Sequence, residues 1–172
     1  AILCDTLVRQ YLINYAKPLI YTTSMSFPSL VAISSVYKLM KQGATLPLIS
    51  HLEVLTAYLF KKLNTLSPYI THPHTNEILL VLPLEAPQSP IFSLLTPYPR
   101  SLAAHCQAIG FVVRPIMPPT VPKGTQRVRI CLHAGNTFKE IEELVQCILL
   151  WLEKEHRKRV RTPHESLLKA VL

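Results

Sequence analysis

The residues with the clearest potential for ligand chemistry are two arginines in one short segment. The sequence PPTVPKGTQRVRICL covers residues 118–132 and places Arg127 and Arg129 in an alternation of polar and apolar side chains. Successive side chains of a β-strand point to opposite faces, so Val128 and Ile130 are predicted to face a core while both arginines face away from it. A planar guanidinium group can donate two charge-assisted hydrogen bonds to a carboxylate. The pattern alone favours a solvent-exposed arginine without a ligand.

A second candidate site is a turn rich in hydroxyl groups. Thr22, Thr23 and Ser24 follow an apolar segment and precede Pro28, where a helix is predicted. Free backbone N–H groups and short hydroxyl side chains are what a phosphate group needs. The same residues also suit a simple cap for the helix that follows.

Histidines and cysteines give weaker signals. His72 and His74 have no cysteine or acidic partner nearby, and we interpret them as turn residues rather than metal ligands. The four cysteines form no CxxC pair and are expected to be buried thiols of a reducing compartment, which predicts a cytoplasmic protein. They are Cys4, Cys106, Cys131 and Cys147.

Length and composition predict one domain with a hydrophobic core. The chain has 172 residues, of which 49% are hydrophobic, and this argues against global disorder. No apolar run reaches the eighteen or so residues of a membrane span, and AILCDTLVRQ does not resemble a signal peptide, so no membrane partner is predicted. The chain lacks an initiator methionine, and we expect it to begin within a larger protein.

The net charge of +8 suggests an anionic partner, but four of the charges lie close together in the C-terminal tail. Arg157, Lys158, Arg159 and Arg161 supply them and leave 8 − 4 = +4 for the rest of the chain. Cations at a helix end complement the carbonyl dipole, which we favour over nucleic-acid binding because no aromatic platform accompanies the run. We therefore predict no nucleic-acid partner; the alternative is a basic tail that binds DNA with steep salt dependence.

The spacing of apolar residues, together with the prolines and glycines that end helices and strands, predicts an α/β domain. Helices are expected at 6–15, 28–41, 47–64, 99–108 and from 138 onward, and strands at 19–22, 91–95, 111–116 and 127–133. Shorter strands are expected at 1–4 and 78–82. The last helix has the firmest start, because Thr137 and Glu140 have the spacing of a capping box.

Several motifs, in order, resemble the C-terminal part of the α-oxoamine synthases, which are pyridoxal-phosphate enzymes. The similar segments are YLINYAKPLIYTTS at 11–24, Ser89-Pro90-Ile91, Ala108-Ile109-Gly110-Phe111, and PPTVPKGTQRVRICLHAGNT at 118–137. The resemblance spans about residues 1–156 and is strongest to the 8-amino-7-oxononanoate synthase subfamily, which uses an acyl-CoA in biotin synthesis.

The resemblance implies a fold and a domain organisation. It implies the small C-terminal domain of the fold type I aminotransferase fold, with helices packed on a small, mostly antiparallel sheet. Residues 1–26 would be the end of the large cofactor-binding domain, 27–156 the small domain, and 157–172 a basic tail.

The resemblance also implies roles for single residues. Arg129 would bind the carboxylate of the amino-acid substrate, and Thr120 would lie near the acyl substrate. Thr22 and Thr23 would contact the phosphate of pyridoxal 5'-phosphate in the neighbouring subunit. Arg127 is expected to be structural or solvated. The implied partners are an amino acid, an acyl-CoA, and a second subunit of a homodimer or a partner large domain.

Two departures from the family pattern limit the resemblance. Members often carry arginine just before PPTVP, where this chain has Met117 and the nearest arginine is Arg114, so the acyl substrate stays open. No lysine has the context of the family's Schiff-base lysine, which lies in a T-x-x-K-[A/G] segment: Lys17 precedes a proline at a helix end, and Lys123, although it follows Thr120 by three residues and precedes Gly124, lies in a predicted turn. This predicts that the isolated chain is inactive. The alternatives are a non-catalytic dimerisation or regulatory module for a full-length synthase, or another branch of the family, of the 5-aminolevulinate synthase or 2-amino-3-ketobutyrate CoA ligase type.

Overall fold

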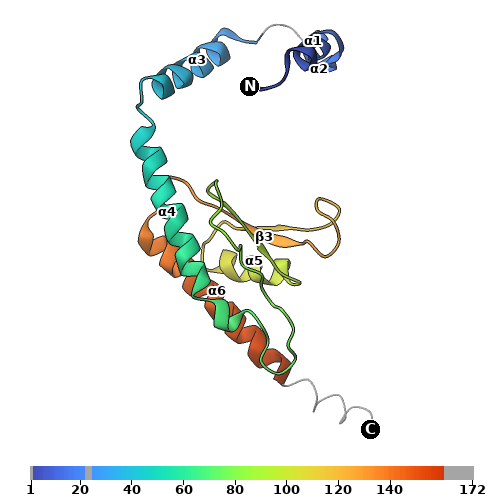
Figure 1. Ribbon diagram of the computed structural model, residues 1–172, viewed down its shortest axis with the longest axis vertical. Coiled ribbons are helices and arrows are strands. Elements are labelled where there is room, and N and C mark those ends of the chain that lie inside the picture. The colour runs from blue at the N-terminus through green and yellow to red at the C-terminus, as the bar shows by residue number, and fades with distance from the viewer. Residues whose placement is uncertain (1, 22–24, 161–172) are drawn as a thin grey trace. The chain divides into compact units, whose positions relative to one another are not determined.

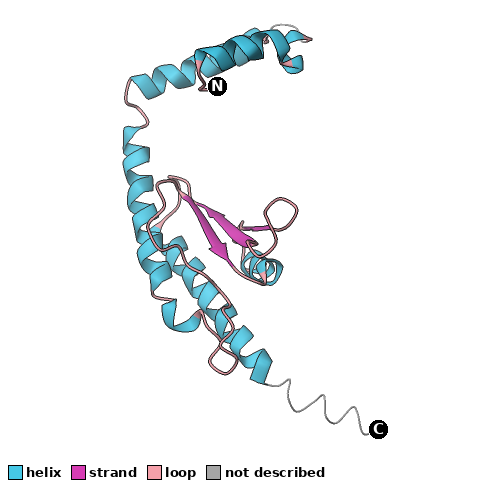
Figure 2. Ribbon diagram, turned by 45° about the vertical axis from the view of Figure 1, so that its right-hand side comes forward, coloured by secondary structure: helices cyan, strands magenta, loops and turns pink. Residues whose placement is uncertain are grey.

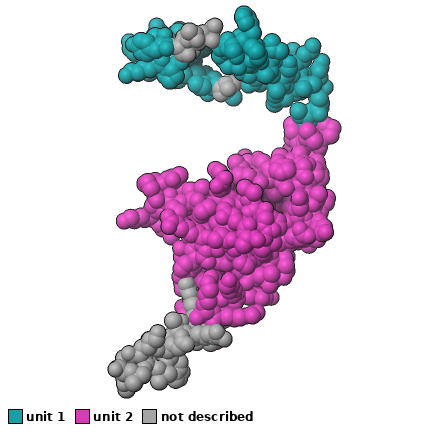
Figure 3. Space-filling view, turned by 180° about the vertical axis from the view of Figure 1, so that it is seen from behind, with its two compact units in different colours: residues 1–46 teal, residues 47–172 magenta. Residues whose placement is uncertain are grey.

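The computed structural model describes residues 2–21 and 25–160, which belong to two compact units. The first comprises residues 1–46 and the second residues 47–172 (Figure 3). The predicted domain boundary near residue 26 concerns the organisation of full-length relatives and stays a prediction.

The first unit consists of helices whose apolar side chains find no core within the unit. The helices are α1 (Thr6–Tyr15), α2 (Lys17–Ile20) and α3 (Phe27–Lys41). Asp5 caps α1, because its carboxylate accepts a hydrogen bond of 2.9 Å from the backbone N–H of Leu7. None of the described side chains of α1 or α3 is buried, so packing within this unit contributes little to its stability.

Two strand predictions in the first unit are wrong. Residues 17–20 form the short helix α2 instead of leading into a strand at 19–22, and residues 2–5 have no regular structure. Pro18 lies in the first turn of α2, where its fixed φ angle suits a helix and its missing N–H costs nothing. No strand occurs among the described residues of this unit, so an extended segment there would have no hydrogen-bonding partner.

The second unit contains three long helices and a short 3-10 turn. They are α4 (Leu46–Asn64, which begins at the last residue of the first unit), η1 (Ser67–Tyr69), α5 (Pro99–Ala108) and α6 (Phe138–Val160). The predicted capping box at the start of α6 is confirmed: Thr137 Oγ1 accepts from the Glu140 N–H at 3.2 Å, and a Glu140 carboxylate oxygen accepts from the Thr137 N–H at 2.7 Å.

The sheet has three strands in the order β1-β3-β2, and both pairs are antiparallel. The strands are β1 (Ile91–Leu95), β2 (Arg114–Ile116) and β3 (Arg127–Cys131). β1 and β2 run parallel to each other, are joined through α5, and have β3 between them (Figures 1 and 2). The α/β prediction with an antiparallel sheet is confirmed, although the predicted strands at 111–116 and 127–133 are shorter and 78–82 forms only isolated bridges.

One face of the sheet belongs to the hydrophobic core. α5 packs against β2 and β3, and α6 packs against α5. The strands contribute Phe92, Leu94, Val128 and Ile130, each at most 3% exposed, and α6 contributes Trp151. Burial of a side chain of this size stabilises the fold by about 1.5–3 kcal/mol, so this face holds the second unit together.

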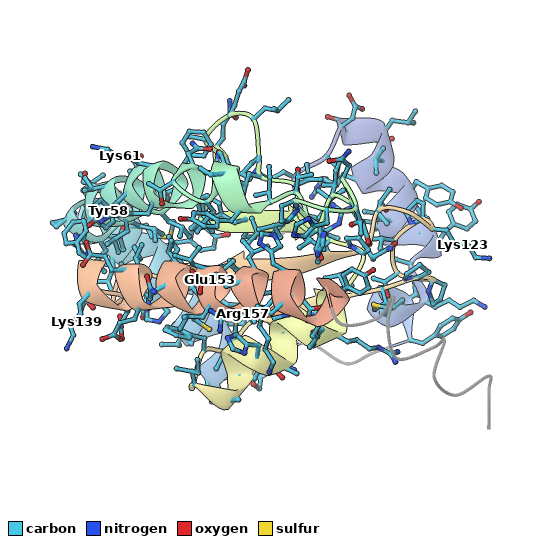
Figure 4. All side chains as sticks on the ribbon, turned by 90° about the horizontal axis from the view of Figure 1, so that it is seen from below. Tyr58, Lys61, Lys123, Lys139, Glu153 and Arg157 are labelled. Atoms are coloured by element: carbon cyan, nitrogen blue, oxygen red, sulfur yellow. The ribbon has the colours of Figure 1, made fainter. Side chains whose placement is uncertain are left out.

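A polar contact joins α4 to α6 at the edge of the core. The Tyr58 hydroxyl and the Lys62 ammonium group both donate to the same carboxylate oxygen of Glu142, the latter at 2.8 Å. The hydrogen bond from Lys62 lowers the pKa of Glu142, and Tyr58 adds to this effect. The Tyr58 ring also meets the Phe138 ring edge-on, and Tyr58 lies at the same end of the helical layer as Lys139 (Figure 4).

The histidine and cysteine predictions have mixed outcomes. His72 is fully buried in a turn, where its Nδ1 accepts from the N–H groups of His74 and Thr75, which confirms the turn interpretation. Cys106 and Cys147 are buried with their sulfur atoms 3.7 Å apart, and burial raises the pKa of the Cys106 thiol. Cys4 and Cys131 are exposed, so the expectation of four buried thiols is wrong for these two.

The basic end of α6 is partly neutralised by the helix itself. Arg157 lies 3.6 Å from a carboxylate oxygen of Glu153, and Lys158 lies 2.7 Å from the buried carboxylate of Glu155. These contacts favour a solvated helix end over a nucleic-acid site. Arg161 lies outside the described residues.

Candidate functional site

The alternation predicted for residues 127–131 is present in β3. Val128 and Ile130 are buried, Arg129 and Cys131 are exposed, and Arg127 is half-buried. We call the side of the sheet away from the core the open face. Antiparallel partners share a face, so this face consists of Ile91, Ser93, Leu95, Arg114, Ile116, Arg127, Arg129 and Cys131.

The strand register gives Arg129 two neighbours on the open face. Ser93 of β1 pairs with Arg129 on one side, and Arg114 of β2 pairs with it on the other. Directly opposite residues have Cβ atoms about 4.5–5.5 Å apart, so the two arginines start from adjacent positions. Periodicity along one segment cannot reveal this neighbour, because it depends on the register between β2 and β3.

The two adjacent arginines are electrostatically uncompensated. Within residues 2–21 and 25–160, neither Arg114 nor Arg129 forms an ion pair or a side-chain hydrogen bond. Arg127 differs, because its Nε donates to the Thr125 carbonyl oxygen at 2.9 Å. This hydrogen bond holds Arg127 against its own loop, in agreement with the structural role expected for it.

The carboxylates of α6 do not supply the missing partner. All five glutamates of this helix have a partner, either in the capping box or in an ion pair with a lysine or arginine of α4 or α6. They are Glu140, Glu142, Glu143, Glu153 and Glu155. The open face therefore keeps two guanidinium groups available for an anion.

Thr120 lies in the loop that joins β2 to β3. The loop covers residues 117–126 and extends beyond the strand ends (Figure 2), and the Thr120 N–H donates to the Met117 carbonyl oxygen at 3.0 Å. Its side chain is exposed. The loop connects the strands of Arg114 and Arg129, so the three residues belong to one hairpin, and the role of Thr120 stays a prediction.

The described residues include neither of the predicted cofactor contacts. Thr22 and Thr23 lie outside the described residues. Lysine lines none of the four cavities described in the second unit, and Lys62, Lys139 and Lys158 are engaged in ion pairs. None of these four cavities therefore contains a lysine to which pyridoxal 5'-phosphate could attach.

The four cavities described in the second unit are not lined by the paired arginines. One of about 380 Å³ lies where β3 meets the start of α6 and is lined by Cys131, His133, Asn136 and Glu140, among others. Arg129, Arg114 and Thr120 line none of the four described cavities. Arg114 and Arg129 are exposed and lie outside these four cavities.

Known proteins with related sequences are named as a synthase and as an aminoacyl transferase. The 8-amino-7-oxononanoate synthase of Emericella nidulans is 42% identical over 165 residues, and the match covers 93% of this chain and 37% of that protein. The aminoacyl transferase sphA of Aspergillus fumigatus is 35% identical over 153 residues, which cover 84% of this chain and 32% of that protein. The chain is homologous to the C-terminal part of the α-oxoamine synthases. It spans about a third of the length of these curated relatives.

A solved structure supports the fold of this α-oxoamine synthase segment. The crystal structure of 8-amino-7-oxononanoate synthase from Francisella tularensis matches 88% of this chain and 41% of its own chain, with a TM-score of 0.58 and 18% sequence identity. The chain therefore has the fold of the C-terminal part of a pyridoxal-phosphate-dependent transferase. No protein-family model matches the sequence.

A test for membrane-spanning segments gives a limited result. Among the described residues, no single helix is long and apolar enough to cross a membrane. α3 and α4 would satisfy the same length and composition test only if they were counted together as one interrupted span.

Proposed function

We propose that this chain is the substrate-binding C-terminal part of a pyridoxal-phosphate-dependent acyl-CoA:amino-acid C-acyltransferase of the 8-amino-7-oxononanoate synthase type, which acts in biotin synthesis. Arg129 carries the proposal. Its guanidinium group is exposed on the open face, has no acidic partner among the described residues, and belongs to the GTQRVRI motif. A planar fork of N–H donors suits the carboxylate of an amino acid.

In this proposal the chain binds and orients substrate and does not provide the covalent cofactor site. Arg129 holds the carboxylate, and Thr120 in the loop 117–126 lies near the acyl substrate. Thr22 and Thr23 are the proposed phosphate contacts across a subunit interface. When bound, the cofactor supplies the electron sink for carbanion chemistry, and its lysine attachment belongs to the large domain of the intact enzyme.

Cofactor attachment provides the first test. The purified chain is mixed with pyridoxal 5'-phosphate, reduced with borohydride and examined by peptide mass spectrometry. We expect only scattered, substoichiometric labelling of exposed lysines, because lysine lines none of the four cavities described in the second unit. Stoichiometric labelling of one lysine would contradict the proposal that this chain lacks the covalent cofactor site.

A second candidate function is a non-catalytic module that associates with a full-length synthase. The first unit favours it, because its described side chains are not buried and many are large and apolar. Either role gives this surface a protein partner, a second subunit or a large domain, and the four free cysteines suit a reducing compartment such as the cytoplasm. Light scattering of the chain alone and mixed with full-length synthase separates the two roles. A stable mixed complex whose synthase activity changes with the amount of added chain would favour the regulatory module.

A further inference from the structure

The pairing of Arg114 with Arg129 destabilises the sheet unless an anion binds to the two guanidinium groups. Like charges directly opposite each other on neighbouring strands destabilise a sheet. Here the strand register places them opposite each other, both side chains are exposed, and no acidic residue occurs in β1, β2 or β3. The neighbouring positions on the open face are taken by Ser93 and by apolar residues such as Ile116.

We propose that Arg114 is a second carboxylate-binding residue and shares the substrate carboxylate with Arg129. A carboxylate has two oxygens with about four acceptor positions, so it can accept from two guanidinium groups at once. Its negative charge between the two groups also removes the repulsion that the register creates. This inference rests on the proposed function of Arg129 and extends it to a residue outside the GTQRVRI motif.

Arg127 provides a matched control on the same strand and the same face. It pairs with Leu95 and Ile116 instead of with another arginine, and its Nε is already used by the Thr125 carbonyl oxygen. Substituting it removes the same charge from the open face without touching the pair. Any effect of net charge alone is therefore the same for Arg127→Gln as for Arg114→Gln.

The test titrates the whole chain with propionate at constant ionic strength, with chloride as the balancing anion. Dissociation constants come from backbone amide shifts of β2 and β3 in the wild type and in Arg114→Gln, Arg129→Gln and Arg127→Gln. Each lost charge-assisted hydrogen bond weakens binding by about tenfold or more, so we expect that change for the first two variants and less than about twofold for Arg127→Gln. Trp151 fluorescence checks that each variant is folded, because this tryptophan is buried in the core of the second unit.

Each outcome decides a separate point. Loss of binding in Arg129→Gln with no change in Arg114→Gln would overturn the shared carboxylate and leave the proposed role of Arg129 intact. Equal, small changes in all three variants would mean general charge attraction and would contradict both. Tighter binding of inorganic phosphate than of propionate, with the same dependence on the two arginines, would overturn the assignment to a substrate carboxylate.

Thermal unfolding gives a second readout that does not depend on weak binding. At low ionic strength Arg114→Gln is expected to unfold at a higher temperature than the wild type, because it relieves the repulsion, and the difference should shrink in 0.5 M NaCl. Added propionate should raise the unfolding temperature of the wild type more than that of Arg114→Gln. A variant that is less stable at low salt would show that Arg114 has a partner in the fold and would contradict the proposal.

Discussion

The two faces of the three-stranded sheet are built from alternating residues of the same strands but have opposite properties. Val128 and Ile130 are buried with α5 and α6, whereas their neighbours Arg127 and Arg129 belong to the open face. Removing atoms from the covered face leaves a cavity, while changing an exposed residue of the open face such as Arg129 disturbs little packing. The side chains on one face of a strand can therefore stabilise the fold while those on the other face are available to bind a ligand.

The largest expected effect comes from the covered face. Ile130→Ala should lower the free energy of unfolding by about 2–5 kcal/mol, because the side chain is 3% exposed and the shortened residue leaves a cavity. Urea denaturation followed by Trp151 fluorescence measures it. The control is the neighbouring Arg129→Gln, for which we expect a change within about 0.5 kcal/mol. Similar losses for both variants would remove the distinction between the faces.

A smaller loss is expected where the chain leaves the sheet and enters α6. Thr137→Ala should cost about 1 kcal/mol, because it removes the oxygen that accepts from the Glu140 N–H. The same denaturation experiment measures it, and Thr137→Ser, which keeps the hydroxyl, should recover most of the loss. An unchanged midpoint for the alanine variant would mean that the capping box does not hold the helix start.

The stability of the second unit should also depend on pH, through His156 in α6. Burial lowers the pKa of His156, the nearby His72 ring adds to the shift, and a hydrogen bond with the Tyr69 backbone and the charge of Glu153 oppose it. The unfolded chain then takes up this proton at a higher pH than the folded chain. This contribution to stability is complete above about pH 6.5 and is lost as the pH falls through the lower folded pKa.

Denaturation midpoints at pH 7.5, 6.5 and 5.5 test this sign. The effect should be smaller than that of the cap, because the His156 side chain is only partly buried. His156→Gln should flatten the part of the pH dependence that this residue causes. A wild type that becomes more stable on acidification would contradict the expected direction.

The smallest effect is expected at the surface contact between α4 and α6. Glu142→Gln should lower the denaturation midpoint less than any of the variants above, because the ion pair with Lys62 is largely solvated. The difference from the wild type should disappear in 0.5 M NaCl. A loss comparable to that of Ile130→Ala would show that this contact contributes to the fold as much as the core does.

Much of the fold can be predicted from local sequence patterns, and the wrong predictions also have local causes. Helix α6 could be predicted because Thr137 and Glu140 mark its start and its apolar stripe has helical spacing. The strand prediction at residues 19 and 20 is wrong because apolar side chains after Pro18 suit either a strand or a short helix, and only a partner strand distinguishes the two.

The candidate site could be predicted only in part. Alternation along residues 127–131 gives the face of Arg129, and the order of motifs gives its proposed role. Its neighbour Arg114 depends on pairing between strands that are separated by a ten-residue loop, and no pattern within either strand encodes this register. Likewise, Cys106 and Cys147 meet only because α5 packs against α6.

The most direct test of the central claim is to observe the Nε–H resonance of Arg129 by NMR during addition of propionate, with Arg129→Gln for assignment. The account predicts a saturable shift and slower hydrogen exchange for this guanidinium group, while Arg127 changes little because its Nε is already hydrogen-bonded. A resonance of Arg129 that does not respond, or that moves only as much as the resonances of arginines far from the sheet, would contradict the account.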